Sequence, residues 1–236
     1  MAAETEHDAQ ARGPIATAAL IGHDGAERAF LDTSAAQRMP HAWLISGPRG
    51  IGKMTLAYRM ARFQLSEAGG GGLFGPPDTL FMDPDDAIFR RILAGGHGDL
   101  RVIERVVNER TKKLRGDIIV DQIRGLSRFY TMTSAEGGWR IAIIDGAEEM
   151  NPNAANALLK LLEEPPENTL YLMVTYHYQD LLTTIISRLQ LVTIPSFSED
   201  ELTGYLVKNQ GATSEDAIKA YRFSNGSLPN AVADLK

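Results

Sequence analysis

Residues 42–65 read AWLISGPRGIGKMTLAYRMARFQL, and this stretch decides the fold. The first five residues predict a buried strand, residues 47–53 form a glycine-rich turn, and apolar side chains on neighbouring helical turns follow. The spacing GxxxxGK between a strand and a helix is that of the P-loop, whose backbone N–H groups wrap a phosphate while the lysine reaches the terminal phosphates. The alternative is a glycine-rich turn with an exposed lysine, and the strand–loop–helix context favours the P-loop over it.

Outward from the P-loop, apolar runs alternate with helical stretches, which predicts an α/β fold: a sheet sandwiched by helices. Asn151 is a good N-cap, and Pro152 is tolerated at the first helical position. The further strands are predicted at residues 99–104, 139–145, 169–175 and 191–194, and the further helices at 119–129, 151–162 and 181–187.

The character of the chain changes after Pro195, where no further strand-like run appears. Capping patterns that begin at Ser198 and Thr213 predict a small all-helical domain. We therefore expect a disordered or loosely docked segment over residues 1–20, a P-loop core over 21–195 and a helical lid over 196–236.

Charge and composition limit the function. The formal net charge of −6 disfavours a whole-protein electrostatic grip on DNA, because phosphate binding needs clustered lysine and arginine. Any contact with nucleic acid should be local or indirect. The chain has no cysteine, so disulfides and thiolate zinc sites are excluded, and no apolar run approaches the length of a membrane span. These features suit a cytoplasmic protein that contacts no membrane.

The P-loop departs from that of an active ATPase. Magnesium binding calls for Ser or Thr directly after Lys53, but this position is Met54, which cannot ligate a hard cation. Thr55 is one helical step further on, and that step turns a side chain by about 100°. Asp145 ends a predicted strand and is a candidate second magnesium partner, or a cap for the next turn. Gly146 follows it, where an ATPase of this class has a glutamate to orient water.

The run NPNAANALLKLLEEPP at residues 151–166 resembles the signature of bacterial clamp-loader subunits, and the run IIDGAEEM precedes it. With the later Ser187-Arg188 pair, these residues are similar to the delta-prime family of DNA polymerase III clamp-loader subunits, within the AAA+ class. The resemblance covers roughly residue 21 to residue 236. It implies an AAA+ core with a parallel five-stranded sheet, followed by a helical lid.

The resemblance also implies roles for single residues. Motor subunits of the loader keep a hydroxyl residue after the P-loop lysine, a glutamate after the strand-end aspartate, and an ATP-sensing arginine where this chain has Pro229 and Asn230. This pattern resembles a non-hydrolysing stator, in which Arg188 is an arginine finger for a neighbouring motor subunit and Ser187 is its partner in the motif. The degenerate nucleotide-binding positions are Gly47, Gly50, Gly52, Lys53, Met54, Thr55, Asp145 and Thr175, the last at the first sensor position.

The implied partners are motor subunits and delta and, through the complex, the sliding clamp and primed DNA. The whole assembly serves a DNA-directed DNA polymerase, a nucleotidyltransferase. Family members commonly carry a four-cysteine zinc module, and its place, residues 69–86, holds no cysteine here, so no metal is expected. The resemblance implies a third, collar domain that this chain does not include.

Two alternatives remain open at this stage: an active motor-type ATPase, supported by Lys53 and Asp145, and a DNA-binding module without nucleotide chemistry. The P-loop could hold ATP or ADP weakly, hold a bare phosphate or sulfate ion, or hold nothing.

Overall fold

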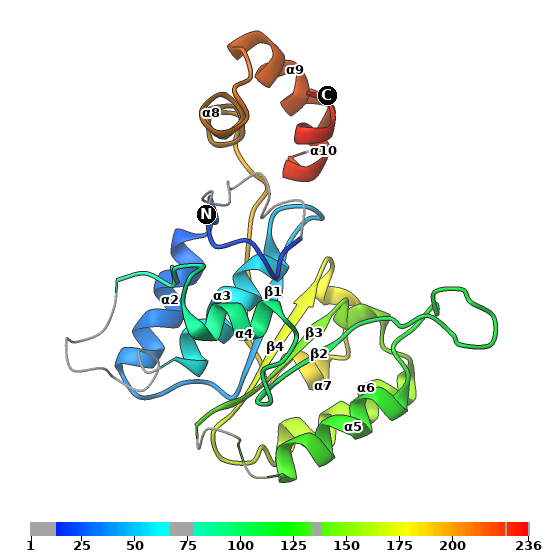
Figure 1. Ribbon diagram of the computed structural model, residues 1–236. Helices are drawn as coiled ribbons and strands as arrows, with labels where there is room; N and C mark the ends of the chain where they lie inside the picture. Colours follow the sequence, from blue (N-terminus) through cyan, green and yellow to red (C-terminus); the bar gives the residue numbers. More distant parts are fainter. Residues whose placement is uncertain (1–12, 67–77, 133, 135–137, 225, 236) are drawn as a thin grey trace.

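A computed structural model describes residues 13–66, 78–132, 134, 138–224 and 226–235. Its centre is a parallel sheet of five strands in the order β2-β3-β4-β1-β5 (Figure 1). The strands are β1 (Ala42–Ser46), β2 (Leu100–Ile103), β3 (Arg140–Asp145), β4 (Thr169–Thr175) and β5 (Gln190–Thr193).

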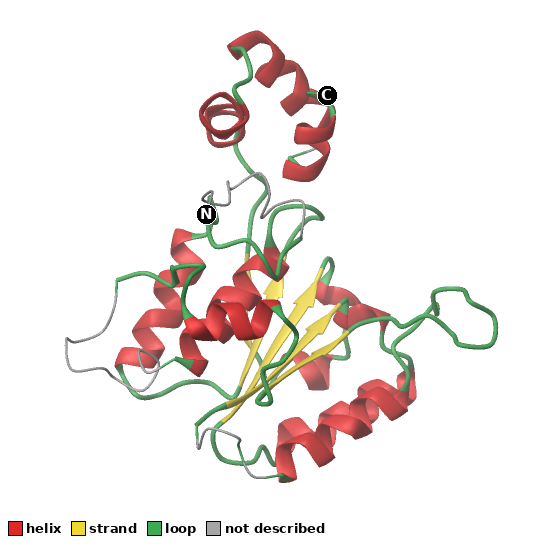
Figure 2. Ribbon diagram, in the orientation of Figure 1, coloured by secondary structure: helices red, strands yellow, loops and turns green. Residues whose placement is uncertain are grey.

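Helices cover both faces of the sheet (Figure 2). This arrangement explains why every residue of β1 and β4 is buried: a parallel strand covered on both faces presents no side to water. The first layer contains α2 (Asp24–Ala35), α3 (Lys53–Leu65) and α4 (Ala87–Leu93), and the second contains α5 (Val120–Thr131), α6 (Pro152–Glu163) and α7 (Thr183–Ile186). Two short 3₁₀ turns, η2 (Ala147–Glu149) and η3 (Tyr178–Asp180), follow β3 and β4.

The strand register positions the P-loop. Ser46 at the end of β1 pairs with Thr175, while Asp145 at the end of β3 pairs with Val174 on the other side of β4. The carboxyl ends of β1, β3 and β4 therefore meet at one edge of the sheet. The P-loop starts there, because it directly follows Ser46.

Residues 1–20 were expected to be disordered or loosely docked, and the first described residues of this segment pack on α3. Arg62 donates to the carbonyls of Ile15 (2.6 Å) and Thr17 (3.2 Å). Arg59 donates to the carbonyl of Ala18 and pairs with Glu27 at 2.6 Å. Buried guanidinium groups need acceptors, so these arginines fix residues 15–18 against the core. Residues 1–12 lie outside the described part of the chain.

The helical lid comprises α8 (Glu199–Gln210), α9 (Ser214–Ser224) and α10 (Leu228–Ala233). The predicted caps are confirmed: Ser198 and Glu201 form a capping box, and the Thr213 hydroxyl accepts from the backbone N–H of Asp216 at 3.2 Å. The lid touches the core at the P-loop, where the backbone N–H of Leu228 donates to the Gly50 carbonyl at 3.1 Å.

The predicted architecture, a parallel five-stranded sheet between helices, is confirmed, and the five strands were predicted to within two residues at each end. Asn151 caps α6 as expected, by accepting from the backbone N–H of Ala154 at 2.9 Å. Helices α2 and α4 were not predicted. The glycine- and proline-rich stretch at 69–77 lies outside the described residues. Among those that are described, no helix is long and apolar enough to cross a membrane.

The packing of α6 yields a stability prediction. Leu158 is fully buried against the sheet, so Leu158→Ala should lower the free energy of unfolding by about 2–5 kcal/mol through lost burial and a residual cavity. Chemical denaturation measures this change. The control Lys160→Ala alters an exposed residue of the same helix and should have little effect. A loss below about 1 kcal/mol for Leu158→Ala would contradict the assigned core.

Candidate functional site

The P-loop, residues 47–53, is enclosed by other parts of the chain. Gly50 has a φ of +75°, and a Cβ there would lie 2.1 Å from the Ser227 hydroxyl oxygen of the lid. A Cβ on Gly47 would lie 2.4 Å from the Ile194 carbonyl oxygen. Only glycine therefore fits either position, because the lid and the end of β5 approach the loop backbone this closely.

The Lys53 side chain is directed into its own loop. Its ammonium group donates to the carbonyls of Gly47 (2.7 Å) and Pro48 (2.6 Å), and only 4% of the residue is exposed. Burial lowers the pKa of Lys53 to about 8, although the carboxylates of Glu148 and Asp145 oppose this shift. The group that would reach a terminal phosphate is thus satisfied by protein acceptors.

Tyr176 covers this lysine. The Lys53 Nζ atom lies 4.3 Å from the centre of the Tyr176 ring, and the guanidinium carbon of Arg49 lies 4.4 Å from it. Cations at this distance from an aromatic face are attracted to it. Glu148 fixes the start of this segment, because its carboxylate accepts from the Tyr176 backbone N–H at 2.9 Å.

Asp145 lies at the predicted strand end, within electrostatic range of Lys53. Burial and the carboxylates of Glu104 and Glu149 raise the pKa of Asp145, and Lys53 opposes that shift. Gly146 has a φ of +72°, and a Cβ on it would meet the Glu149 carboxylate at 2.6 Å. The left-handed backbone and the nearby Glu149 carboxylate both disfavour a side chain at position 146, where an active ATPase of this class has a glutamate.

The remaining P-loop positions also fit magnesium–ATP poorly. Met54 is partly buried and packs against the core, and Thr55 is buried. Pro48 has no backbone N–H to offer a phosphate, and the N–H of Gly47 donates to the Thr175 carbonyl at 3.3 Å. Within the described residues, no three His, Asp or Glu side chains are grouped as a metal site.

Thr175, at the expected first sensor position, is fully buried beside Ser46. Its hydroxyl has no hydrogen-bond partner among the described residues. An unpartnered buried hydroxyl costs free energy, so Thr175 is one polar group at this edge that the chain leaves unsatisfied.

Arg188 and Ser187 lie at the opposite end of the sheet. They follow α7 and precede the first residue of β5, whereas the P-loop follows the last residue of β1, the strand beside β5. Strands rise by about 3.3 Å per residue, so the length of β1 alone separates the two by roughly 13 Å. Arg188 therefore does not belong to the P-loop site of its own chain.

The Arg188 guanidinium is held at the surface with its side chain 34% exposed. It donates to the Thr184 carbonyl at 2.7 Å and to the Glu163 carboxylate at 2.9 Å. Ser187 donates to the same carbonyl at 3.1 Å, which orders the turn. The expected pair is thus positioned by α7 and by the end of α6.

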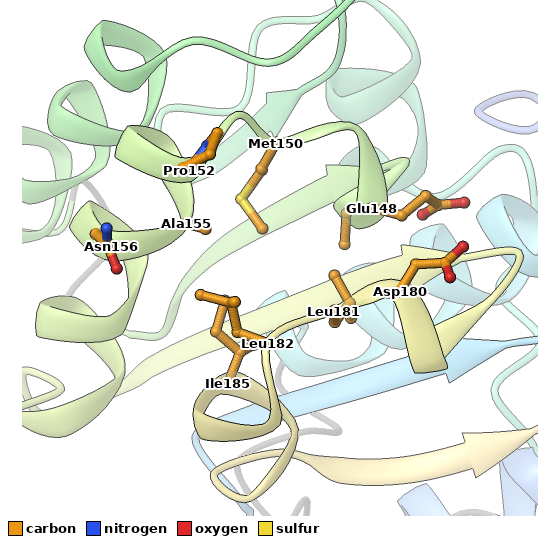
Figure 3. A pocket seen from close by; sticks show the side chains of 10 residues that line it. Glu148, Met150, Pro152, Ala155, Asn156, Asp180, Leu181, Leu182 and Ile185 are labelled. Carbon is orange, nitrogen blue, oxygen red and sulfur yellow. The ribbon is translucent and has the colours of Figure 1, made fainter.

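A pocket of about 290 Å³ lies between η2 and α6 on one side and η3 and α7 on the other (Figure 3). Leu181, Leu182 and Ile185 face Met150 across it, while Glu148 and Asp180 lie at one end. Among the described residues that line it, these two carboxylates are the charged side chains, so the pocket does not suit an anionic ligand such as a nucleotide.

Sequence reasoning missed three contacts at these sites. Tyr176 directly follows Thr175 at the end of a predicted strand. Its sequence position could therefore have predicted that it lies beside the P-loop. Ser227 and Glu163 gave no such signal, because their contacts with Gly50 and Arg188 depend on the docking of separate elements.

Comparison with known proteins shows which family the chain resembles. The family described as "DNA polymerase III, delta subunit" matches residues 22–198. The chain is 38% identical over 148 residues to DNA polymerase III subunit delta' of Pseudomonas aeruginosa, covering 63% of this chain and 41% of that protein. It is 32% identical over 171 residues to subunit delta' of Bacillus subtilis, covering 70% and 46%.

A gamma subunit of Buchnera aphidicola is 27% identical over 218 residues, covering 90% of this chain and 55% of that protein. The chain thus spans about half the length of these relatives. Among solved structures, the RuvB Holliday junction branch migration motor of Thermotoga maritima matches with a TM-score of 0.51 and 16% identity, covering 87% of this chain and 57% of that one. That likeness supports the fold alone.

The burial of Lys53 yields a pH prediction. A lysine whose pKa is near 8 in the folded chain and near its usual value when unfolded binds fewer protons when folded across that window. The free energy of unfolding should therefore rise with pH between about 8 and 10 through this group, and Lys53→Met should lose that rise.

Denaturation curves of wild type and Lys53→Met at several pH values test this, with Lys208→Met, at an exposed site on α8, as the control. The stability difference between wild type and Lys53→Met should change with pH, and that for the control should not. Parallel pH profiles for wild type and Lys53→Met would contradict the assigned environment.

Proposed function

Because this chain belongs to the delta-prime family of DNA polymerase III clamp-loader subunits, we propose that it is a non-hydrolysing stator of the loader. In this role it assembles with motor subunits and delta, and the complex places the sliding clamp on primed DNA. The chain supplies an arginine to the nucleotide site of the adjacent motor subunit and hydrolyses no ATP itself.

The observation that carries the proposal is the state of the P-loop. The Lys53 ammonium donates to two carbonyls of its own loop beneath Tyr176. Met54 stands where an active ATPase has a magnesium ligand, and Gly146 stands where it has a glutamate that orients water. A nucleotide would have to displace these contacts without a magnesium ion held by a hydroxyl side chain at position 54. Loss of hydrolysis in this chain is the simplest consequence.

The position of Arg188 supports action on a neighbour. It lies away from its own P-loop, is partly exposed and is paired only with groups at the surface. An exposed ion pair such as Arg188–Glu163 is worth about 0–1 kcal/mol, so a triphosphate on an adjacent subunit could replace Glu163 at little cost. The planar guanidinium suits contact with phosphate oxygens that gain charge during transfer.

A motor-type ATPase is the second candidate, and the match to a gamma subunit over 90% of this chain favours it. Lys53 and Asp145 also persist at their expected positions. Three features oppose it: Met54 replaces a magnesium ligand, Gly146 replaces the glutamate that orients water, and Lys53 is engaged by the carbonyls of its own loop.

Substitution of the proposed finger tests the stator role. Arg188→Ala should reduce hydrolysis at the motor site that it completes by about 10³ to 10⁵, because a trans arginine stabilises the transition-state charge. The ATPase rate of the assembled loader should then fall by the amount that this one motor site contributes. Arg188→Lys should restore it only in part, since an ammonium lacks the two-pronged geometry.

Arg90→Ala is the matched control, because Arg90 is also an exposed arginine near a helix end and pairs with a carboxylate, that of Asp85. Its ATPase rate in the loader should equal that of wild type. Equal rates for Arg188→Ala and Arg90→Ala, in loaders of the same composition, would refute the finger assignment.

A further inference from the structure

The pocket between η2, α6, η3 and α7 has no part in the stator role proposed above (Figure 3). We call it the α6–α7 pocket. Its volume of about 290 Å³ lies just below the range of about 300–1,000 Å³ that is usual for small-molecule and cofactor sites. A cavity of this size suits a side chain of another protein better than it suits a cofactor.

The walls of the α6–α7 pocket are mostly aliphatic. The apolar side chains that line it include Met150, Ala155, Leu181, Leu182 and Ile185. Leu182 is 45% exposed although its side chain is large and apolar. An exposed leucine on the wall of an apolar pocket gains free energy when a second apolar group covers it. The walls therefore favour an occupant with an apolar stem.

Two carboxylates lie at one end of the pocket. Glu148 accepts from the backbone N–H of Tyr176 through Oε1 at 2.9 Å, whereas its Oε2 is buried and has no hydrogen-bond partner among the described residues. Lys53 lies within electrostatic range of Glu148, yet it donates its hydrogen bonds to carbonyls of its own loop. Asp180 is exposed, and within the described part of the chain its carboxylate takes part in no ion pair. A buried acceptor without a donor costs free energy, so this end of the pocket favours a cation that can donate hydrogen bonds.

The α6–α7 pocket borders the surface that carries Arg188. Ile185 lines the pocket, and the residue before it, Thr184, accepts from the Arg188 guanidinium at 2.7 Å. On α6, Asn156 lines the pocket and Glu163 pairs with Arg188. Seven residues are close to two helical turns, so Asn156 and Glu163 lie on the same face of α6, roughly 10 Å apart along its axis. A protein that covers Arg188 can therefore also reach the pocket.

We propose that the α6–α7 pocket receives a lysine or arginine side chain of the adjacent motor subunit. The choice of partner rests on the proposed function, because the motor subunit is the chain that Arg188 would serve. The aliphatic stem of the incoming side chain packs between Met150 and Leu182. Its cationic head donates to Glu148 and Asp180. The two subunits thus exchange basic residues across their interface.

The chemistry of the pocket disfavours other occupants. A phosphate or an acidic side chain would meet two carboxylates at the end of the pocket. A wholly apolar side chain would cover the walls but would supply no donor to the buried Oε2 atom of Glu148. A basic side chain with an aliphatic stem avoids both costs.

Charge reversal at the acidic end tests the proposal. Asp180→Arg should weaken binding of the full chain to the purified motor subunit by about tenfold or more, because it removes a carboxylate and places a like charge beside the incoming cation. Isothermal titration calorimetry measures the two dissociation constants. The matched control is Asp32→Arg, which makes the same charge change at an exposed site on α2, outside the pocket, and should bind as tightly as wild type.

A photo-crosslinking residue, p-benzoylphenylalanine, in place of Leu182 identifies the occupant in the assembled loader. Mass spectrometry should find it joined to a segment of the motor subunit that contains a lysine or an arginine. A crosslink to the sliding clamp, to DNA or to no subunit would overturn the proposal. Equal dissociation constants for Asp180→Arg and Asp32→Arg would overturn it as well.

The ATPase rate of the loader separates this proposal from the stator role. If only the pocket proposal is wrong, Asp180→Arg binds like wild type while Arg188→Ala still lowers the ATPase rate. If the stator role is wrong, Arg188→Ala leaves that rate unchanged.

Discussion

The buried ammonium group of Lys53 determines what the P-loop can do. A buried charge is costly unless it is paired, and here two loop carbonyls and the Tyr176 ring satisfy it. A phosphate would have to displace those partners and would find no N–H on Pro48. The lid reinforces this arrangement, because its Leu228 N–H and Ser227 side chain contact Gly50. The chain thus keeps the backbone of a nucleotide site but directs the polar groups of that site toward one another.

The direction of the parallel strands separates the remaining chemistry into distinct surfaces. The P-loop follows the carboxyl end of β1, whereas Arg188 precedes the amino end of the neighbouring strand β5. An arginine at that end lies too far from its own P-loop to act there, which is consistent with the finger role that we propose. The sheet therefore separates the P-loop, whose lysine is bonded to loop carbonyls, from the exposed arginine.

The sequence was enough to predict the parts that local patterns control. Buried parallel strands appear as short apolar runs, and Asn151, Ser198 and Thr213 marked helix starts that the structure has. It could not predict contacts between distant segments, such as Tyr176 over Lys53 or Glu163 beside Arg188, because these depend on how whole elements dock. The N-terminal segment shows the same limit: residues 15–18 look loose in sequence, and buried arginines of α3 hold them.

The measurement that tests this account most directly is ATP binding and hydrolysis by the purified chain, with and without magnesium. The account predicts no turnover, and binding that is weak at most and indifferent to magnesium, because Met54 cannot ligate a cation, Gly146 cannot orient water and Lys53 is engaged by its own loop. Magnesium-dependent turnover that Lys53→Ala abolishes would contradict it. The motor-type ATPase would then be the better description of this chain.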